Sequence, residues 1–250
     1  MTHRIAVFTD LDDTLFQSAR KVKEADFSGA VQVASALNGH HGLMTRAQAT
    51  LLDWIALERA IPVTARSSEG FSRVALRFGG PAIVANGAVI LDATGVPDLE
   101  WQARVTKSLA PHRAALSEMP DQARKAATQI GAEIRTWLVE EPVCGGVYAV
   151  VKVEPGTPEA ALAQIAPRLR ETVAGPWRVH MNGNNLALIP PGISKAAATG
   201  FLLERLRRDG PVLAIGMGDS SSDLEFMRLC DLWMTPTESQ LDRAIVGLVP

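Results

Sequence analysis

Cysteine, charge imbalance and long apolar runs are all scarce in this chain of 250 residues. Two cysteines, Cys144 and Cys230, are too few for a disulfide framework or a zinc site built from several thiolates. No apolar run approaches the roughly 18 residues that cross a bilayer, and the apolar stretch Ile5 to Phe8 is too short for the core of a signal peptide. We therefore expect a soluble, cytoplasmic protein that is not inserted in a membrane.

The charges nearly cancel, because 25 Lys and Arg stand against 27 Asp and Glu, which leaves a formal net charge of −2. This balance excludes nucleic-acid binding driven by bulk positive charge, and it excludes electrostatic attachment to an anionic membrane. A hydrophobic content of 47% over this length is enough for a sizeable packed core. The composition is that of an ordinary packed globular protein.

Short apolar runs alternate with helical patterns at both ends of the chain. Strands are expected at 4–9, 61–64, 82–85, 212–215 and 232–234, and helices at 44–59, 71–78, 194–208 and 222–229. Thr45 and Gln48 have the spacing of a capping box at the first helix, and Gly79-Gly80 should end the second. This alternation predicts an α/β fold with a Rossmann-like parallel sheet.

The middle of the chain has a different pattern, which predicts a small α+β module. We expect helices at 104–118 and 121–130, strands at 134–139 and 147–154, a helix capped by Thr157, and a hairpin over 177–189. The core would then consist of residues 1–97 and 189–250, with a cap domain inserted at 98–188. Residues 17–43 show little pattern beyond one short helix through Val31, Val33, Ala34 and Leu37.

Acidic residues follow two of the predicted strands. Asp10, Asp12 and Asp13 come after the first strand, and Asp219 and Asp223 follow the strand at 212–215. Ligands of open α/β sheets bind at the carboxyl ends of the strands, and clustered carboxylates attract an oxygen-preferring cation such as Mg²⁺. The alternative is structural, with the first group forming an acidic turn, Asp219 capping a helix and Asp223 facing water.

Two candidate phosphate ligands accompany the acids. Lys195 lies in the first turn of a helix capped by Ser194, where the helix dipole disfavours a cation unless an anion shares the site. Thr64 ends the second strand and offers a hydroxyl beside free N–H groups. A surface lysine and an ordinary helix cap are the alternatives. The co-occurrence of all these groups favours a catalytic metal site.

These residues, in this order, resemble the four motifs of the haloacid dehalogenase (HAD) superfamily of phosphatases. The matching segments are Asp10-Leu11-Asp12-Asp13-Thr14, Thr64, Lys195, and Gly218-Asp219-Ser220-Ser221-Ser222-Asp223. The segment Ala85 to Ile90 also resembles the Cof-like and sucrose-phosphate-phosphatase-like branch. Lys195 follows Thr64 by 131 positions, and this spacing leaves room for a cap of type IIB. The resemblance implies the HAD fold.

The resemblance also implies a role for each matching residue. Asp10 would be the nucleophile that forms an aspartyl phosphate, and Asp12 the general acid and base, with its pKa raised by burial or by neighbouring carboxylates. Mg²⁺ would be held by the Asp10 carboxylate, the Asp12 carbonyl and Asp219, with Asp223 supporting it. Thr64 and Lys195 would hold the phosphoryl oxygens. The implied activity is Mg²⁺-dependent hydrolysis of a small phosphomonoester, most typically a sugar phosphate.

Three positions depart from the family pattern. Ser222 replaces the usual Asn, Asp13 replaces the usual Gly and adds charge beside the nucleophile, and Ala65 stands where Gly often follows the Thr. None removes a catalytic group. A hexose phosphomutase of the same family and a catalytically weak sugar-phosphate sensor remain the alternative functions, and the oligomeric state is expected to be a monomer or a weak homodimer.

Substrate specificity should come from polar residues near strand ends and in the cap. Arg66 and Asn86 in the core, and the cap residues His180, Asn182, Asn184 and Asn185, are the substrate candidates. Amide side chains suit sugar hydroxyls because they both donate and accept hydrogen bonds. For Asn184 and Asn185, ordinary hairpin turn chemistry is the competing explanation.

Overall fold

The computed structural model describes residues 4–36, 39 and 41–247. Contacts within the chain divide it into two compact units. The first, here called the core unit, combines Met1–Asp98 with Ser194–Pro250, and the second, the inserted unit, is Leu99–Ile193. Among the described residues, no helix is both long enough and apolar enough to cross a membrane.

A four-stranded parallel sheet lies at the centre of the core unit, as the sequence predicts. In spatial order its strands are β13 (Leu232–Met234), β12 (Val212–Met217), β1 (Arg4–Thr9) and β5 (Ala60–Pro62). The two central strands, β12 and β1, have the apolar character of strands with helices on both sides. Because all four strands are parallel, their carboxyl ends lie along one edge.

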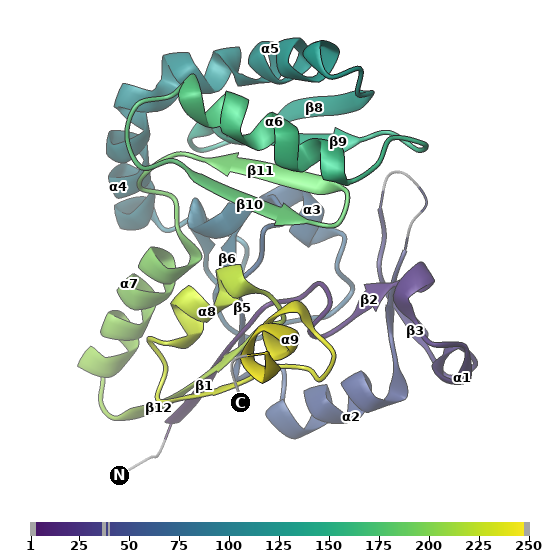
Figure 1. Cartoon of the computed structure of the whole chain (residues 1–250). Coiled ribbons are helices and arrows are strands. Elements are labelled where there is room, and N and C mark those ends of the chain that lie inside the picture. Colours follow the sequence, from purple (N-terminus) through teal and green to yellow (C-terminus); the bar gives the residue numbers. More distant parts are fainter. Residues whose placement is uncertain (1–3, 37–38, 40, 248–250) are drawn as a thin grey trace. The chain divides into compact units, whose positions relative to one another are not determined.

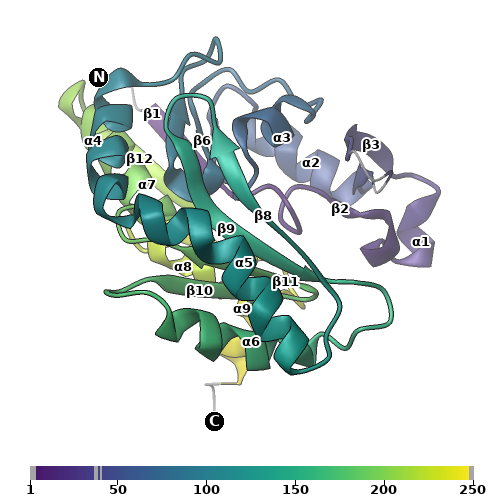
Figure 2. The ribbon, with the colours of Figure 1, turned by 90° about the horizontal axis from the view of Figure 1, so that it is seen from above.

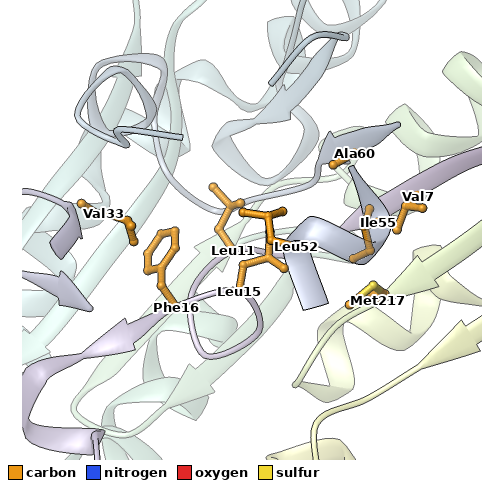
Figure 3. Packing of buried hydrophobic residues seen from close by; sticks show 10 residues of the cluster. Val7, Leu11, Leu15, Phe16, Val33, Leu52, Ile55, Ala60 and Met217 are labelled. Carbon is orange, nitrogen blue, oxygen red and sulfur yellow. The ribbon is translucent and has the colours of Figure 1, made fainter. Parts of the chain in front are cut away.

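Helices pack on both faces of this sheet. On one face, α2 (Arg46–Ile55) places Leu52 and Ile55 in a cluster with Val7 and Met217 (Figure 3). On the other, α7 (Lys195–Arg208) and α8 (Ser221–Met227) contact β12 (Figure 1). A Cβ on Gly216 would come within 2.7 Å of the Met227 backbone, so this glycine permits close packing of α8 against β12.

The predicted capping box at the start of α2 is confirmed. The Thr45 hydroxyl accepts a hydrogen bond from the Gln48 N–H, and the Gln48 side chain accepts one from the Thr45 N–H. These bonds satisfy two backbone donors that the first helical turn would otherwise leave unpaired.

The expected helix through Phe71 and Phe78 is mostly wrong. Helix α3 covers only Ser68–Ser72. Beyond it, the Ala75 N–H donates to the Val33 carbonyl, so this backbone pairs with a neighbouring segment instead of continuing a helix. Strands β6 (Ala82–Val84) and β7 (Val89–Leu91) then form an antiparallel hairpin around the turn η2 (Ala85–Gly87), and one parallel bridge links β6 to Val63.

The described part of residues 17–44 contains a small antiparallel sheet with two short helical elements, where mostly loop was expected. The elements are β2 (Gln17–Ser18), η1 (Ala19–Lys21), α1 (Glu24–Phe27), β3 (Val31–Ala34) and β4 (Gly42–Met44), with strand order β2-β4-β3. The helix expected over Val31 to Ala34 is therefore wrong, and Leu37 lies outside the described residues. β-Branched Val31 and Val33 fit the strand, and pairing with β4 supplies its hydrogen bonds.

The inserted unit contains the expected combination of helices and antiparallel strands. Its sheet has the order β10 (Arg178–Asn182), β11 (Asn185–Ile189), β9 (Gly145–Val153) and β8 (Ile134–Glu141). The helical elements are α4 (Leu99–Leu109), η3 (Ala110–His112), α5 (Arg113–Gln129) and α6 (Ala160–Glu171). Figure 2 shows α5 and α6 side by side against this sheet.

Two helix boundaries in the inserted unit differ from expectation. Helix α5 continues through Pro120, where a break between two helices was expected. Its buried residues Leu116, Met119 and Ala123 flank the proline, and their packing offsets the roughly 3 kcal/mol that an interior proline costs. Helix α6 starts at Ala160 with Glu159 as its cap, and the expected cap Thr157 instead lies in the preceding turn, where its N–H donates to the Glu154 carbonyl.

Candidate active site

Backbone hydrogen bonds continue the parallel sheet past the strand ends and bring the candidate loops together. The Asp10 N–H donates to the Met217 carbonyl at 2.8 Å, and the Val63 N–H donates to the Thr9 carbonyl at 2.8 Å. Asp10 and Thr64 thus emerge at the same edge as the segment that carries Asp219. This edge is where ligands of open α/β sheets bind.

Three carboxylates and one ammonium form a buried cluster at this edge. Oxygen atoms of Asp10, Asp219 and Asp223 all lie within 4.8 Å of one another. The Lys195 Nζ donates to Asp10 Oδ1 and to Asp223 Oδ1, at 2.7 Å each. All four side chains are buried. Four of the residues singled out in the sequence therefore share one site.

The charge of this cluster fits a divalent cation. If all three carboxylates were ionised, the cluster with its one ammonium would have a net charge of −2, which one divalent ion would neutralise. The donors are all oxygen, the ligand type that Mg²⁺ prefers over softer metals. Among the described residues this is the one group of three or more acidic, histidine or cysteine side chains close enough to hold a metal.

Two of the carboxylates resist ionisation in the arrangement seen here. The pKa of Asp10 lies well above its usual range because of burial and of repulsion from Asp223 and Asp219, which outweigh attraction to Lys195. Burial, with repulsion from Asp223 and Asp13, raises the pKa of Asp219 to about 7. A cation bound between these carboxylates would favour their ionised forms.

Lys195 and Asp223 hold each other in their charged forms. Burial disfavours the Lys195 ammonium, but Asp10 and Asp223 more than compensate, so the pKa of Lys195 is raised. Burial also opposes ionisation of Asp223, yet Lys195 and hydrogen bonds from Ser220 hold the pKa of Asp223 below its usual value. Lys195 and Asp223 therefore form a buried ion pair within the site.

Ser220 is a site residue that the sequence reasoning missed. Its N–H and its hydroxyl both donate to Asp223 Oδ2, at 3.1 and 2.6 Å, which leaves Asp223 Oδ1 for Lys195. The available signal was the spacing Ser220-x-x-Asp223 at a helix start, a capping-box pattern with Asp in the acidic position. Ser222 is the residue that departs from the family pattern, and its hydroxyl oxygen lies 2.9 Å from the Ser220 hydroxyl oxygen.

Asp12 is paired with Arg66 and does not join the carboxylate cluster. The guanidinium donates from Nε and Nη2 to the two Asp12 carboxylate oxygens, at 2.7 Å each. The Asp12 side chain is 50% exposed and the Arg66 side chain 20%. The burial expected for Asp12 is thus not observed, and its immediate neighbour is a cation rather than a carboxylate. Burial opposes the charge of Arg66, but its hydrogen bonds and attraction to Asp12, with a smaller contribution from Asp10, raise the Arg66 pKa.

Thr64 and Asn86 lie on the neighbouring segments of this edge. Thr64 is buried, and its hydroxyl accepts a hydrogen bond from the Arg66 N–H at 3.1 Å. The Asn86 N–H donates to the Thr64 carbonyl at 3.0 Å. Asp13, which adds charge beside Asp10, is itself paired with the ammonium of Lys21. The charge of Asp13 nevertheless still contributes to the raised pKa of Asp219.

The four cap candidates lie on one hairpin of the inserted unit. His180 and Asn182 belong to β10, Asn185 pairs directly with Asn182, and the Asn184 carbonyl accepts from the Val153 N–H. Gly183 has a positive φ of 55° between them. Asn184 and Asn185 thus have the turn and pairing roles that hairpin chemistry explains.

No protein-family model and no curated protein sequence matches this chain. Solved structures do match its fold. A sucrose-phosphatase from Synechocystis sp., in complex with sucrose and phosphate, has a TM-score of 0.55 at 17% identity, over 99% of this chain and 97% of that one. An IMP-bound IMP-nucleotidase mutant from Plasmodium falciparum has a TM-score of 0.58 at 12% identity, over 97% and 67% of the two chains.

A haloacid dehalogenase-like hydrolase from Bacteroides thetaiotaomicron has a TM-score of 0.51 at 13% identity, and the match covers 98% of this chain and all of that one. At these identities the likeness concerns the fold. The matches extend over both segments of the core unit and the inserted unit. This chain has the fold of the haloacid dehalogenase-like hydrolases, as its four sequence motifs predict.

Proposed function

We propose that this protein is a Mg²⁺-dependent phosphatase that hydrolyses a small phosphomonoester, foremost a sugar phosphate. The observation that carries the proposal is the buried cluster in which Lys195 bridges Asp10 and Asp223 beside Asp219. A lone acidic cluster would suggest only a cation site. The added buried ammonium and the Thr64 hydroxyl suit a phosphoryl group that shares the site with the cation.

In the proposed reaction, a carboxylate oxygen of Asp10 bonds to phosphorus while the bond from phosphorus to the substrate oxygen breaks. Asp12 gives its proton to that leaving oxygen. In the second step Asp12 takes a proton from water, the water oxygen bonds to phosphorus, and the bond from phosphorus to Asp10 breaks. The products are an alcohol and inorganic phosphate, and both aspartates return to their starting states.

The other residues of the site would stabilise charge during these steps. Lys195 and Thr64 would donate to the phosphoryl oxygens, and Ser220 would keep Asp223 oriented toward Lys195. Mg²⁺, held by Asp10, the Asp12 carbonyl and Asp219 with support from Asp223, would offset the repulsion between the nucleophile and the phosphate.

Arg66 has a place in this proposal because of its ion pair with Asp12. An Asp12 that keeps both oxygens on a guanidinium is a poor proton donor, so Arg66 must give up at least one of these bonds during turnover. An anionic substrate that attracts Arg66 would release Asp12 for that role. The His180, Asn182, Asn184 and Asn185 group would contribute to selection of the rest of the substrate.

The likeness to a sucrose-phosphatase bound to sucrose and phosphate supports a sugar phosphate as the first substrate to test. The likeness to an IMP-nucleotidase makes nucleotides the second class. Phosphate release should be measured with Mg²⁺ across phosphorylated sugars, sugar acids and nucleotides, with Asp10→Asn as the control that cannot form the aspartyl phosphate.

We expect one substrate class to give a much higher kcat/KM than the others and the Asp10→Asn protein to release no phosphate. Isomerisation of a hexose phosphate without phosphate release would identify a mutase instead. Absence of phosphate release from every substrate under several divalent metals would contradict the proposed phosphatase and favour a sensor.

A further inference from the structure

The turn η2 joins two parts of the candidate phosphate site. On one side, the Ala85 N–H donates to the Arg66 carbonyl at 2.6 Å and the Asn86 N–H donates to the Thr64 carbonyl. On the other side, a Cβ placed on Gly87 would lie 2.2 Å from the Ser194 carbonyl oxygen, directly before Lys195. Asn86 is thus fixed between the segments that carry Thr64 and Lys195.

The backbone of this turn is unusual. Ala85 and Asn86 both have left-handed conformations, with φ of 51° and 57°, and Gly87 follows at 93°. Left-handed residues other than glycine are uncommon, and strained backbone of this kind concentrates at functional sites. Hydrogen bonds to Thr64 and Arg66 hold the turn in this conformation.

The Asn86 side chain supplies an independent observation. The residue is only 9% exposed, yet within the part of the chain that the structure describes its amide has no hydrogen-bond partner. The Asn86 amide is not completely enclosed by protein. Among the described residues, the polar side-chain atoms that are both completely enclosed and without a partner belong to other residues. A buried amide without a partner is costly. A ligand that reaches this amide would remove that cost.

We propose that Asn86 is a further substrate-binding residue, whose side-chain NH₂ donates a hydrogen bond to a phosphoryl oxygen of the substrate. This inference rests on the proposed phosphatase function and adds a neutral donor to the lysine and the threonine. The neighbouring polar groups, Thr64 and Lys195, are donors themselves. A ligand contacted by all three groups would therefore be a hydrogen-bond acceptor, and ionised phosphoryl oxygens accept hydrogen bonds but cannot donate them.

The competing explanation is that Asn86 occurs only because asparagine tolerates a left-handed backbone. Asn86→Gly separates the two explanations, because glycine adopts this conformation freely but has no amide. Asn86→Asp gives a second test, since aspartate has the same shape and also tolerates the conformation but would repel a phosphoryl group.

The experiment measures binding of inorganic phosphate by calorimetry, with saturating Mg²⁺, and kcat and KM for an aryl phosphate. We expect Asn86→Gly to weaken phosphate binding and raise KM by about tenfold or more, as for loss of one hydrogen bond to a charged group, with a larger loss for Asn86→Asp. Ala56→Gly is the matched control. Ala56 is also left-handed, with φ of 65°, but caps α2 outside the site, so phosphate binding should not change.

Phosphate binding by Asn86→Gly equal to wild type would overturn the inference. So would an Asn86→Asp protein that binds phosphate normally but changes KM for substrates with hydroxyl groups, because the amide would then face the sugar. If wild type binds phosphate and the variants do not, the inference holds even when no phosphomonoester is hydrolysed, and only the proposed phosphatase activity fails. A wild-type protein that binds no phosphate would contradict the inference directly.

Discussion

The ammonium of Lys195 lies between the carboxylates of Asp10 and Asp223, 2.7 Å from an oxygen of each. Asp10 is 185 residues away from Lys195 in the sequence and Asp223 is 28 residues away. One buried cation therefore joins the end of β1, the start of α7 and the first turn of α8. This ion-pair triad links the stability of the core unit to the chemistry of its candidate site.

Replacement of Lys195 by Met should damage both properties. Removing one member of a buried ion pair leaves carboxylates without a counter-ion, which costs about 3–5 kcal/mol. Phosphate release should fall by about 100-fold to 1,000-fold through loss of a phosphoryl-oxygen donor. Urea unfolding and steady-state assays measure the two effects. Lys125→Met, at an exposed lysine, is the control and should match wild type; normal turnover in Lys195→Met would exclude a phosphate-binding role.

Replacement of Asp219 by Asn should change the Tm, relative to wild type, in opposite directions with and without Mg²⁺. At about pH 8 without metal, the neutral amide relieves repulsion with Asp223 and Asp13, so the Tm should rise. Addition of Mg²⁺ should raise the Tm of wild type but not of the variant, because a ligand is missing. Calorimetry with Asp53→Asn, at an exposed position, provides the comparison. An unchanged Mg²⁺ response in Asp219→Asn would remove this residue from the metal site.

Stabilisation by Mg²⁺ should depend on pH through Asp219. Its pKa is raised to about 7 in the folded, metal-free protein, while an unfolded chain has an Asp pKa of about 3.9. Protonated Asp219 therefore contributes to the free energy of unfolding of the metal-free protein. This contribution is fully present below about pH 4 and is lost as the pH rises through about 7. Mg²⁺ must displace a proton below about pH 7, so the Tm increase should be larger at about pH 8 than at about pH 5.5. An equal increase at both values would contradict this linkage.

Gly87→Ala should impair the site more than the fold. An alanine at this positive φ costs about 1–2 kcal/mol, and its Cβ would also collide with the Ser194 carbonyl and displace the start of α7. Gly95→Ala is the matched control, because Gly95 has a similar φ of +85° but open space around its Cα. We expect comparable turnover in wild type and Gly95→Ala and a fall of about tenfold or more in Gly87→Ala. Equal turnover in the two variants would show that the Gly87 contact does not position Lys195.

Asp12→Asn should reduce turnover without loss of Mg²⁺ binding, since its expected contribution to the metal is a main-chain carbonyl. General acid–base catalysis is worth about 100-fold to 10,000-fold, and the loss should be smaller for an aryl phosphate than for an alkyl phosphate. An aryl leaving group needs less help from a proton donor. Steady-state rates with both substrates and a Mg²⁺-dependent Tm test this. Identical losses for the two substrates would argue against Asp12 as the acid for the leaving group.

Local patterns in the sequence predicted the parallel sheet and the identity of most site residues. Strand β1 and its following acids could be recognised because apolar runs and the residues that end them are local properties. The capping box of Thr45 and Gln48 was recognisable for the same reason. By contrast, α3 ends early because the segment after it pairs with β3, which is distant from it in the sequence. Strand β3 is a strand because it pairs with that segment and with β4.

The sequence by itself determined which polar groups stand at the carboxyl ends of the strands, since strand period and chain order decide that locally. Only the tertiary structure decided how these groups are paired: Lys195 with two carboxylates, Arg66 with Asp12, and Asn86 with no partner for its amide among the residues that the structure describes. Pairing depends on distances between segments that are brought together by folding of the whole core unit. Burial of the three carboxylates around one ammonium has the same origin, because exclusion of water from them requires all the surrounding elements at once.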